Sequence, residues 1–138
     1  MTVNETVIRA EALRKVYGKG DTELVALRDV SIAVERGEVA ALLGPSGSGK
    51  STLLTALVFL NLPERGRIWM EERLVVADGR ALTDLAAVRR TSVGFVFQKA
   101  NLIPFLTARE NVLLALQLND QVGRAADARA RELLGYLG

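Results

Sequence analysis

The sequence predicts a mixed α/β domain built around a glycine-rich loop. Residues 44–51 are Gly-Pro-Ser-Gly-Ser-Gly-Lys-Ser, which matches the pattern G-x-x-x-x-G-K-[ST]. The preceding residues, Val39–Leu43, are all apolar, as expected of a strand buried on both faces. The following residues, Thr52–Leu60, are predicted to form a buried helix. Strand, loop and helix in this order favour a nucleotide-binding site over a flexible Gly/Ser turn.

Each part of the loop suits the binding of a triphosphate. Glycine permits positive φ angles and a close approach of the backbone to a ligand. Successive N–H groups and the positive end of the following helix form an anion site. Lys50 would contact the β- and γ-phosphates, and the Ser51 hydroxyl would ligate Mg²⁺. The predicted binding residues here are Gly44, Pro45, Ser46, Gly47, Ser48, Gly49, Lys50, Ser51 and Thr52.

The remaining elements follow from apolar periodicity and turn signals. Strands are predicted at Val7–Leu13, at Val30–Glu35, at Arg67–Glu71 and, as a second buried strand, at Val93–Phe97. Residues 77–80 are predicted to turn. Thr107 and Glu110 have the spacing of a capping box, which predicts a helix from Thr107 to about Leu118. Further helices are predicted at Leu82–Arg90 and Arg124–Leu137.

The composition restricts the possible functions. The chain has 138 residues, 49% hydrophobic and 25% charged, which fits one globular domain. Cysteine and histidine are absent, which excludes disulfides, thiolate chemistry and an imidazole base within the chain. The basic residues are spread along the sequence and the net charge is +2, so nucleic acid is not an expected partner. Without a secretory pattern or an apolar run longer than Leu53–Leu62, we expect a cytoplasmic protein that does not span the membrane.

Three segments resemble the nucleotide-binding domain of ABC transporters, specifically the exporter type that includes macrolide-export and lipoprotein-release ATPases. The first is Leu43–Leu54, which is very close to the Walker A segment of that family. The second, similar to the Q-loop and the helix after it, comprises Gly94–Gln98, Asn101–Pro104 and Thr107–Val112. The third is Tyr17, followed by Gly18 and upstream of Ala26–Val30. The resemblance runs from about Val7 to the last residue.

This resemblance implies a P-loop NTPase fold with an N-terminal antiparallel β-subdomain, and ATP and Mg²⁺ as ligands. It implies that Tyr17 stacks on adenine, whereas a lone tyrosine beside a glycine is more often a half-buried surface residue. It also implies that Gln98 contacts Mg²⁺ or its water and senses the γ-phosphate. A neutral amide suits that role, although Gln98 alone would be a polar strand end. The implied metal-contacting residues are Ser51 and Gln98.

The resemblance also implies partners. The loop Lys99–Leu106 would receive the coupling helix of a transmembrane permease subunit, and the chain could dimerise with another ATP-binding subunit. The loop carries four apolar residues, which suit a docking surface but could equally fold into a local core: Leu102, Ile103, Phe105 and Leu106. A subunit of this kind would be cytoplasmic and peripheral, on the inner face of the cell membrane.

The sequence departs from the family pattern near Gly138. In relatives this stretch is soon followed by the LSGGQ signature, the Walker B strand with its catalytic Glu, and the switch His, and the 138 residues contain none of these. We therefore expect residues 1–138 to be the N-terminal portion of such a domain, with no complete catalytic set and little hydrolysis. The core sheet would be incomplete, with Val39–Leu43 and Val93–Phe97 unpartnered, so we expect a marginally stable or aggregating chain.

Two functions fit these observations. The leading one is a truncated ATP-binding subunit that binds Mg-ATP to power export by a membrane permease. The alternative is a non-catalytic nucleotide-binding module that docks on a permease or on a full-length ATPase. A small P-loop kinase would need an acceptor site and clustered catalytic arginines, and it would leave the segment around Gln98 unexplained.

Overall fold

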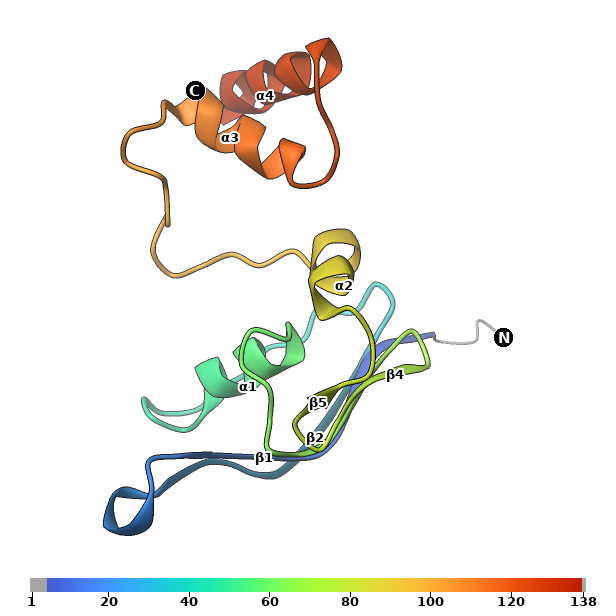
Figure 1. The fold of residues 1–138 in the computed structure, drawn as a ribbon, viewed down its shortest axis with the longest axis vertical. Helices are drawn as coiled ribbons and strands as arrows, with labels where there is room; N and C mark the ends of the chain where they lie inside the picture. The colour runs from blue at the N-terminus through green and yellow to red at the C-terminus, as the bar shows by residue number, and fades with distance from the viewer. Residues whose placement is uncertain (1–4, 138) are drawn as a thin grey trace. The chain divides into compact units, whose positions relative to one another are not determined.

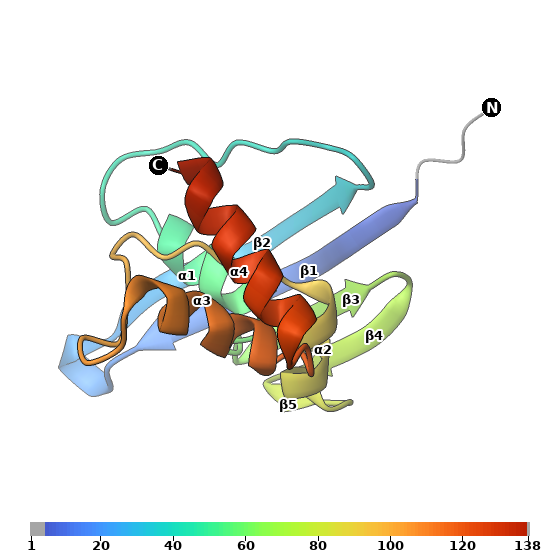
Figure 2. The ribbon, with the colours of Figure 1, turned by 90° about the horizontal axis from the view of Figure 1, so that it is seen from above.

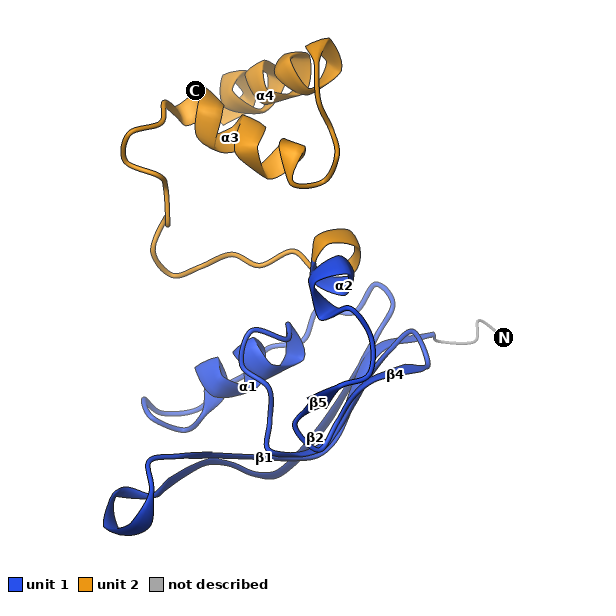
Figure 3. Ribbon diagram, viewed as in Figure 1, with its two compact units in different colours: residues 1–89 blue, residues 90–138 orange. Residues whose placement is uncertain are grey.

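The computed structural model describes residues 5–137, which form two compact units. The first unit comprises residues 1–89 and the second comprises residues 90–138 (Figure 3). The first unit contains an antiparallel sheet, the glycine loop and helix α1 (Figure 1). The second contains the helices α3 and α4. The helix α2, Leu85–Ser92, crosses the boundary between the units.

The sheet of the first unit has five antiparallel strands in the order β2-β1-β3-β4-β5 (Figure 2). Their bounds are β1 Thr6–Tyr17, β2 Leu24–Glu35, β3 Arg65–Met70, β4 Arg73–Ala77 and β5 Arg80–Ala81. The three strands predicted for this region correspond to β1, β2 and β3, and β4 and β5 were not predicted. The expected antiparallel subdomain is therefore confirmed. Its strands β1 and β2 form a hairpin that pairs Tyr17 with Leu24.

The core of the first unit lies between this sheet and α1, Lys50–Leu57. The helix contacts β1 and β2 and buries Leu53, Ala56 and Leu57. The sheet contributes fully buried side chains: Leu13, Ile68, Val75 and Val76. After the helix, the carbonyl oxygen of Phe59 accepts a hydrogen bond of 2.8 Å from Arg89 Nη1. The glycine loop is thus anchored to a packed apolar layer through the helix that follows it.

The predicted strands at Val39–Leu43 and Val93–Phe97 are wrong. Both segments are irregular and pair with no strand in the described part of the chain. Most of their side chains are open to solvent, with Val39 and Val96 each 96% exposed, whereas Val93 and Phe95 are half-buried. An apolar run becomes a strand only when neighbouring strands satisfy its N–H and C=O groups, and residues 5–137 supply no such neighbours. The expected incomplete core sheet is the physical reason for this difference.

Helix α2 begins three residues later than predicted. The Asp84 carboxylate accepts hydrogen bonds from the backbone N–H groups of Ala86 and Ala87, at 2.9 and 3.1 Å. These are donors that the first turn of a helix leaves without intrahelical partners. Asp84 therefore fixes the start of the helix, a capping signal that the apolar pattern alone does not locate.

In the second unit, α3, Ala108–Gln117, packs against α4, Arg124–Leu137. The capping box predicted at the start of α3 is confirmed. Thr107 Oγ1 accepts from the backbone N–H of Glu110 at 3.2 Å, and Glu110 Oε2 accepts from the backbone N–H of Thr107 at 2.7 Å. The hydrogen bond from the Thr107 N–H contributes most to holding the pKa of Glu110 below its ordinary value. The bounds of α4 are those that the sequence predicts.

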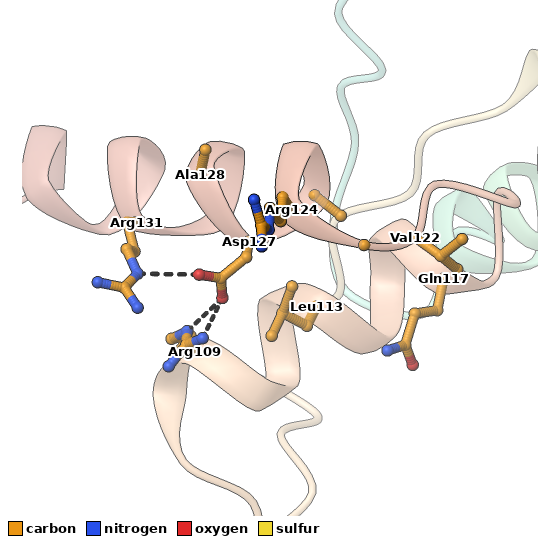
Figure 4. A pocket seen from close by; sticks show the side chains of 10 residues that line it. Arg109, Leu113, Gln117, Val122, Arg124, Asp127, Ala128 and Arg131 are labelled. Carbon is orange, nitrogen blue, oxygen red and sulfur yellow. Dashed lines mark hydrogen bonds and ion pairs between the residues drawn. The ribbon is translucent and has the colours of Figure 1, made fainter.

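A hollow of about 620 Å³ lies between α3 and α4 (Figure 4). At one side of it, the Asp127 carboxylate pairs with Arg109 of α3 and, at 3.0 Å, with Arg131 of α4. The hydrogen bonds from Arg109 contribute most to holding the pKa of Asp127 below its ordinary value. The two helices are thereby joined by an exposed ionic cluster. Within residues 5–137 no helix combines the length and the apolarity needed to cross a membrane.

Candidate functional site

The glycine loop leads directly into α1. Gly49 is the N-cap residue of the helix and has a φ of +88°, and Gly44 and Gly47 have φ angles of +153° and +80°. Residues other than glycine rarely adopt these φ angles, so the three glycines let the backbone curl in front of the helix. The loop also closes on itself, because the N–H of Ser48 donates to the carbonyl of Pro45 at 3.3 Å. The curl places backbone N–H groups where the helix dipole favours an anion.

Lys50 carries its ammonium into this curl. Its Nζ donates to the carbonyl oxygens of Gly44 and Pro45, at 2.7 and 2.6 Å, and to Ser48 Oγ at 3.2 Å. An ammonium has three donors, and here the loop accepts all of them. A phosphate that reaches the loop would therefore replace at least one of these acceptors with a charged oxygen. A bond between two opposite charges is stronger than the ammonium–carbonyl bond that it displaces.

Ser51 and Thr52 form the first turn of α1 behind Lys50. Ser51 is exposed, and its hydroxyl makes no hydrogen bond to any described residue. The backbone carbonyl groups of both residues accept hydrogen bonds from Thr55 Oγ1, at 2.9 and 3.0 Å. Thr55, in the next turn of the helix, thereby fixes the first turn. The Ser51 hydroxyl is thus presented on a fixed backbone with its oxygen open to a metal ion.

A pocket of about 530 Å³ joins the loop to the β1–β2 hairpin. This volume is within the range of small-molecule sites, about 300–1,000 Å³. The hairpin supplies Tyr17, Leu24, Val25 and Ala26, and the loop and helix supply Ser46, Gly47, Gly49, Lys50, Ser51 and Thr52. The structure therefore brings Tyr17 together with most of the predicted phosphate-binding residues. Gly44, Pro45 and Ser48 do not line the pocket, but they hold the Lys50 ammonium from behind.

Tyr17 stands at the end of β1 with 39% of its surface exposed. Its hydroxyl accepts a hydrogen bond from Asn61 Nδ2, and the Lys15 ammonium lies 5.7 Å from the ring centroid. Neither Asn61 nor Lys15 was predicted as a site residue. Asn61 lies 44 residues from Tyr17, and no local pattern connects the two positions.

Gln98 belongs to the second unit, where it is exposed and follows the irregular segment at Val93–Phe97. Its contact with Mg²⁺ stays a prediction. The adjoining loop Lys99–Leu106 is partly folded. Leu102 and Phe105 are 63% and 86% exposed, whereas Ile103 and Leu106 are half-buried. The sequence left open whether these apolar residues form a docking surface or a local core. Leu102 and Phe105 remain available for docking, whereas Ile103 and Leu106 pack partly into the loop.

Asn111 of α3 organises that loop. Its Oδ1 accepts from the backbone N–H of Ile103 at 2.8 Å, and its Nδ2 donates to the carbonyl of Leu106 at 3.1 Å. The same amide also donates to the carbonyl of Thr107 at 3.0 Å. No role was predicted for Asn111 beyond its place in the helix after the loop. These bonds hold the loop so that Leu102 and Phe105 remain at its surface.

Most of the chain matches a known protein family. The family model described as ABC transporter matches residues 27–138, which include the whole glycine loop. The chain belongs to the ABC transporter family. The match begins ten residues after Tyr17, so the ring that lines the pocket lies outside the matched region.

Several relatives carry the ATP-binding description in their names. The chain is 41% identical to the lipoprotein-releasing system ATP-binding protein LolD of Bordetella avium, over 97% of this chain and 57% of that protein. It is 37% identical to the ABC transporter ATP-binding protein MJ1508 of Methanocaldococcus jannaschii, over 96% of this chain and 58% of that protein. The macrolide export ATP-binding/permease protein MacB of Bdellovibrio bacteriovorus is 41% identical, with 20% of its length covered. The chain thus spans somewhat more than half the length of LolD and MJ1508.

Solved structures show the same fold. The dimeric post-hydrolysis structure of the ATP-binding cassette MJ0796, bound to ADP and Pi, matches with a TM-score of 0.81 at 34% identity. The match covers 93% of this chain and 56% of that one. A nucleotide-free ATP-binding cassette from an ABC transporter matches with a TM-score of 0.66 at 26% identity, over 88% of this chain and 44% of that chain. The P-loop NTPase fold predicted from the sequence is confirmed.

Proposed function

We propose that this chain is the ATP-binding part of an ABC transporter ATP-binding subunit and holds Mg-ATP in the pocket between the glycine loop and Tyr17. The observation that carries the proposal is that the curled loop, the Lys50 ammonium and the Tyr17 ring meet around one pocket of suitable volume. The phosphates would accept from the loop N–H groups and from Lys50. The adenine would stack on Tyr17, whose ring offers an aromatic face.

Magnesium would enter with the nucleotide. The residues described here contain no group of three or more carboxylate, imidazole or thiolate side chains able to hold a metal ion. Mg²⁺ is commonly bound through one or two protein oxygens together with substrate phosphates and water. The Ser51 hydroxyl is an oxygen ligand of this kind. As a separate assignment, taken from the family resemblance, we propose that the amide oxygen of Gln98 contacts Mg²⁺ or its water. Both are hard neutral donors and suit this ion.

The pocket lacks a group that could activate water. No carboxylate is among the residues that line it, and the sequence contains no histidine. Phosphoryl transfer to water needs a positioned residue that orients or deprotonates the nucleophile. We therefore assign to these 138 residues the binding of Mg-ATP with little or no hydrolysis. Export by a membrane permease would be driven by ATP hydrolysis, which would require catalytic groups that this pocket does not hold.

The loop Lys99–Leu106 is the proposed contact with the transmembrane permease subunit, and the chain would act in the cytoplasm at the inner face of the cell membrane. The exposed Leu102 and Phe105 of this loop support the assignment, because clusters of solvent-facing apolar side chains mark interaction sites. A second ATP-binding subunit is a further proposed partner. A photo-reactive amino acid in place of Phe105 should cross-link to an integral membrane protein in cells, and one in place of the exposed Tyr136 should not.

The Lys50→Ala substitution tests the nucleotide site, with Lys19→Ala as a matched control. Lys19 is exposed and does not line the pocket. Loss of a charge-assisted contact to phosphate, worth about 1.5–3 kcal/mol, should weaken Mg-ATP binding about 10- to 100-fold by titration calorimetry. The control should bind as the unaltered chain does. Equal affinity of all three proteins would refute the role of Lys50.

A further inference from the structure

The turn after α1 is tied to the end of β1 at three points. The Asn61 amide donates to the Tyr17 hydroxyl, and Lys15 Nζ donates to the carbonyl of Leu62 at 2.8 Å. Two residues farther on, the N–H of Glu64 donates to the carbonyl of Arg14 at 2.8 Å. The segment from residue 61 to residue 64 therefore runs beside the last residues of β1. Pro63 within it is fully buried, which fixes the segment against the sheet.

The same segment is fixed to α1. The backbone N–H of Asn61 donates to the carbonyl of Thr55 at 3.1 Å, and Asn61 itself is half-buried. Its amide thus stands on backbone that the helix holds in place. One end of α1 presents the glycine loop, and the turn at its other end reaches the Tyr17 hydroxyl. The glycine loop and the turn that carries Asn61 are thus connected through α1.

From this geometry we infer that Asn61 is a positioning residue for the nucleobase, acting through Tyr17. This inference rests on the proposed function. A tyrosine at the end of a hairpin, 39% exposed, would otherwise rotate about its side-chain torsions. The hydrogen bond from Asn61 holds the ring at one orientation before the ligand arrives. Binding costs free energy when a mobile side chain has to be ordered. Ordering the Tyr17 ring in advance removes this cost from the binding step and raises affinity for the base.

The test compares Mg-ATP with inorganic tripolyphosphate, which carries the phosphates without a base. In the unaltered chain ATP should bind more tightly, because it alone contacts Tyr17. Asn61→Ala should weaken ATP binding about three- to tenfold, as expected for the loss of one hydrogen bond, and leave tripolyphosphate affinity unchanged. Asn119→Ala is the matched control, since the Asn119 amide donates to a helix carbonyl in the second unit. It should change neither affinity.

A double-mutant cycle separates positioning from a general structural effect. Tyr17→Phe removes the hydroxyl that Asn61 contacts, so Asn61→Ala should cost nothing further in that background. An equal loss of ATP and tripolyphosphate affinity in Asn61→Ala would overturn the inference, as would unchanged ATP affinity. Equal affinity of the unaltered chain for the two ligands would overturn it while leaving the loop assignment intact. Failure of the unaltered chain to bind either ligand would instead refute the proposed function.

Discussion

A Cβ atom on Gly49 would lie 2.3 Å from the carbonyl oxygen of Ala26, so the start of α1 meets β2 with no room for a side chain. This contact joins the glycine loop to the hairpin that carries Tyr17. The glycine is therefore required twice, once for its φ of +88° and once for the close approach. Gly47 shares only the first requirement, because nothing lies within 4 Å of its added Cβ.

Gly49→Ala should accordingly destabilise the first unit more than Gly47→Ala does. Backbone strain and overpacking together predict a loss of about 2–4 kcal/mol in the free energy of unfolding for Gly49→Ala. Strain alone predicts about 1–2 kcal/mol for Gly47→Ala. Denaturant titration followed by the fluorescence of Trp69, the only tryptophan, reports on this unit. Equal losses in the two variants would show that the contact with Ala26 carries no cost.

The capping box at the start of α3 makes a second prediction. Thr107→Ala removes the side chain that accepts from the Glu110 N–H and should destabilise the helix by about 1 kcal/mol. Thr107→Ser keeps a hydroxyl at the same position and should retain most of that stability. Circular dichroism of thermal unfolding compares the variants. A serine variant as unstable as the alanine variant would contradict the role of the cap.

The carboxylates of the second unit predict sensitivity to acid. The pKa of Asp127 is lowered mainly by hydrogen bonds from Arg109, and that of Glu110 mainly by the backbone N–H of Thr107. A lowered pKa in the folded state stabilises the fold above the unfolded-state pKa, and this contribution is lost as the pH falls through the folded-state value. Helicity of the second unit should therefore decline in acid, below about pH 4.

Asp127→Asn provides the comparison, because an amide cannot titrate. Measured by circular dichroism, the helical signal of this variant should be lower than that of the unaltered chain at pH 7. It should also change less between pH 5 and pH 2. High salt should narrow the difference at pH 7, since the ion pairs with Arg109 and Arg131 are exposed. Parallel pH profiles of the two proteins would show that Asp127 contributes nothing to the acid response.

Much of the site could be predicted from the sequence because its determinants are local. The glycine spacing, the Lys50 ammonium and the start of α1 all lie within ten residues, and the capping box at Thr107 spans four. Each of these features forms through interactions between residues that are close in the sequence. The segments at Val39–Leu43 and Val93–Phe97 differ, because a strand depends on partners that lie elsewhere in the chain. Their apolar composition predicted full burial, but within residues 5–137 only Val93 and Phe95 become even half-buried.

Contacts between distant residues follow from no local pattern, and only the family resemblance predicted that Tyr17 belongs to the site. Tyr17 reaches the glycine loop through the pairing of β1 with β2, and Asn61 reaches Tyr17 through the turn that follows α1. The strand β4 was missed although its side chains Val75 and Val76 are fully buried. It is five residues long, and only its pairing with β3 and β5 distinguishes it from other short apolar runs.

The two unpartnered apolar segments predict self-association. Val96 is 96% exposed, so Val96→Lys should reduce aggregation measured by light scattering without lowering the unfolding temperature. Val122→Lys is the matched control, because Val122 is 68% exposed and lies outside both segments. An equal reduction by both substitutions would indicate a general effect of charge. A sharp, reversible unfolding transition at high temperature would contradict the expected marginal stability.

Nuclear magnetic resonance of the chain titrated with Mg-ATP locates the ligand residue by residue, and so tests whether the nucleotide binds at the glycine loop. The largest changes in amide chemical shift should fall on Gly44 and on Ser46–Thr52, with the ring signals of Tyr17 shifting in parallel. The hollow between α3 and α4 is the larger concavity and serves as the internal comparison. Changes centred on Arg109, Asp127 and Arg131, with the glycine loop unaffected, would show that the nucleotide does not bind at the loop.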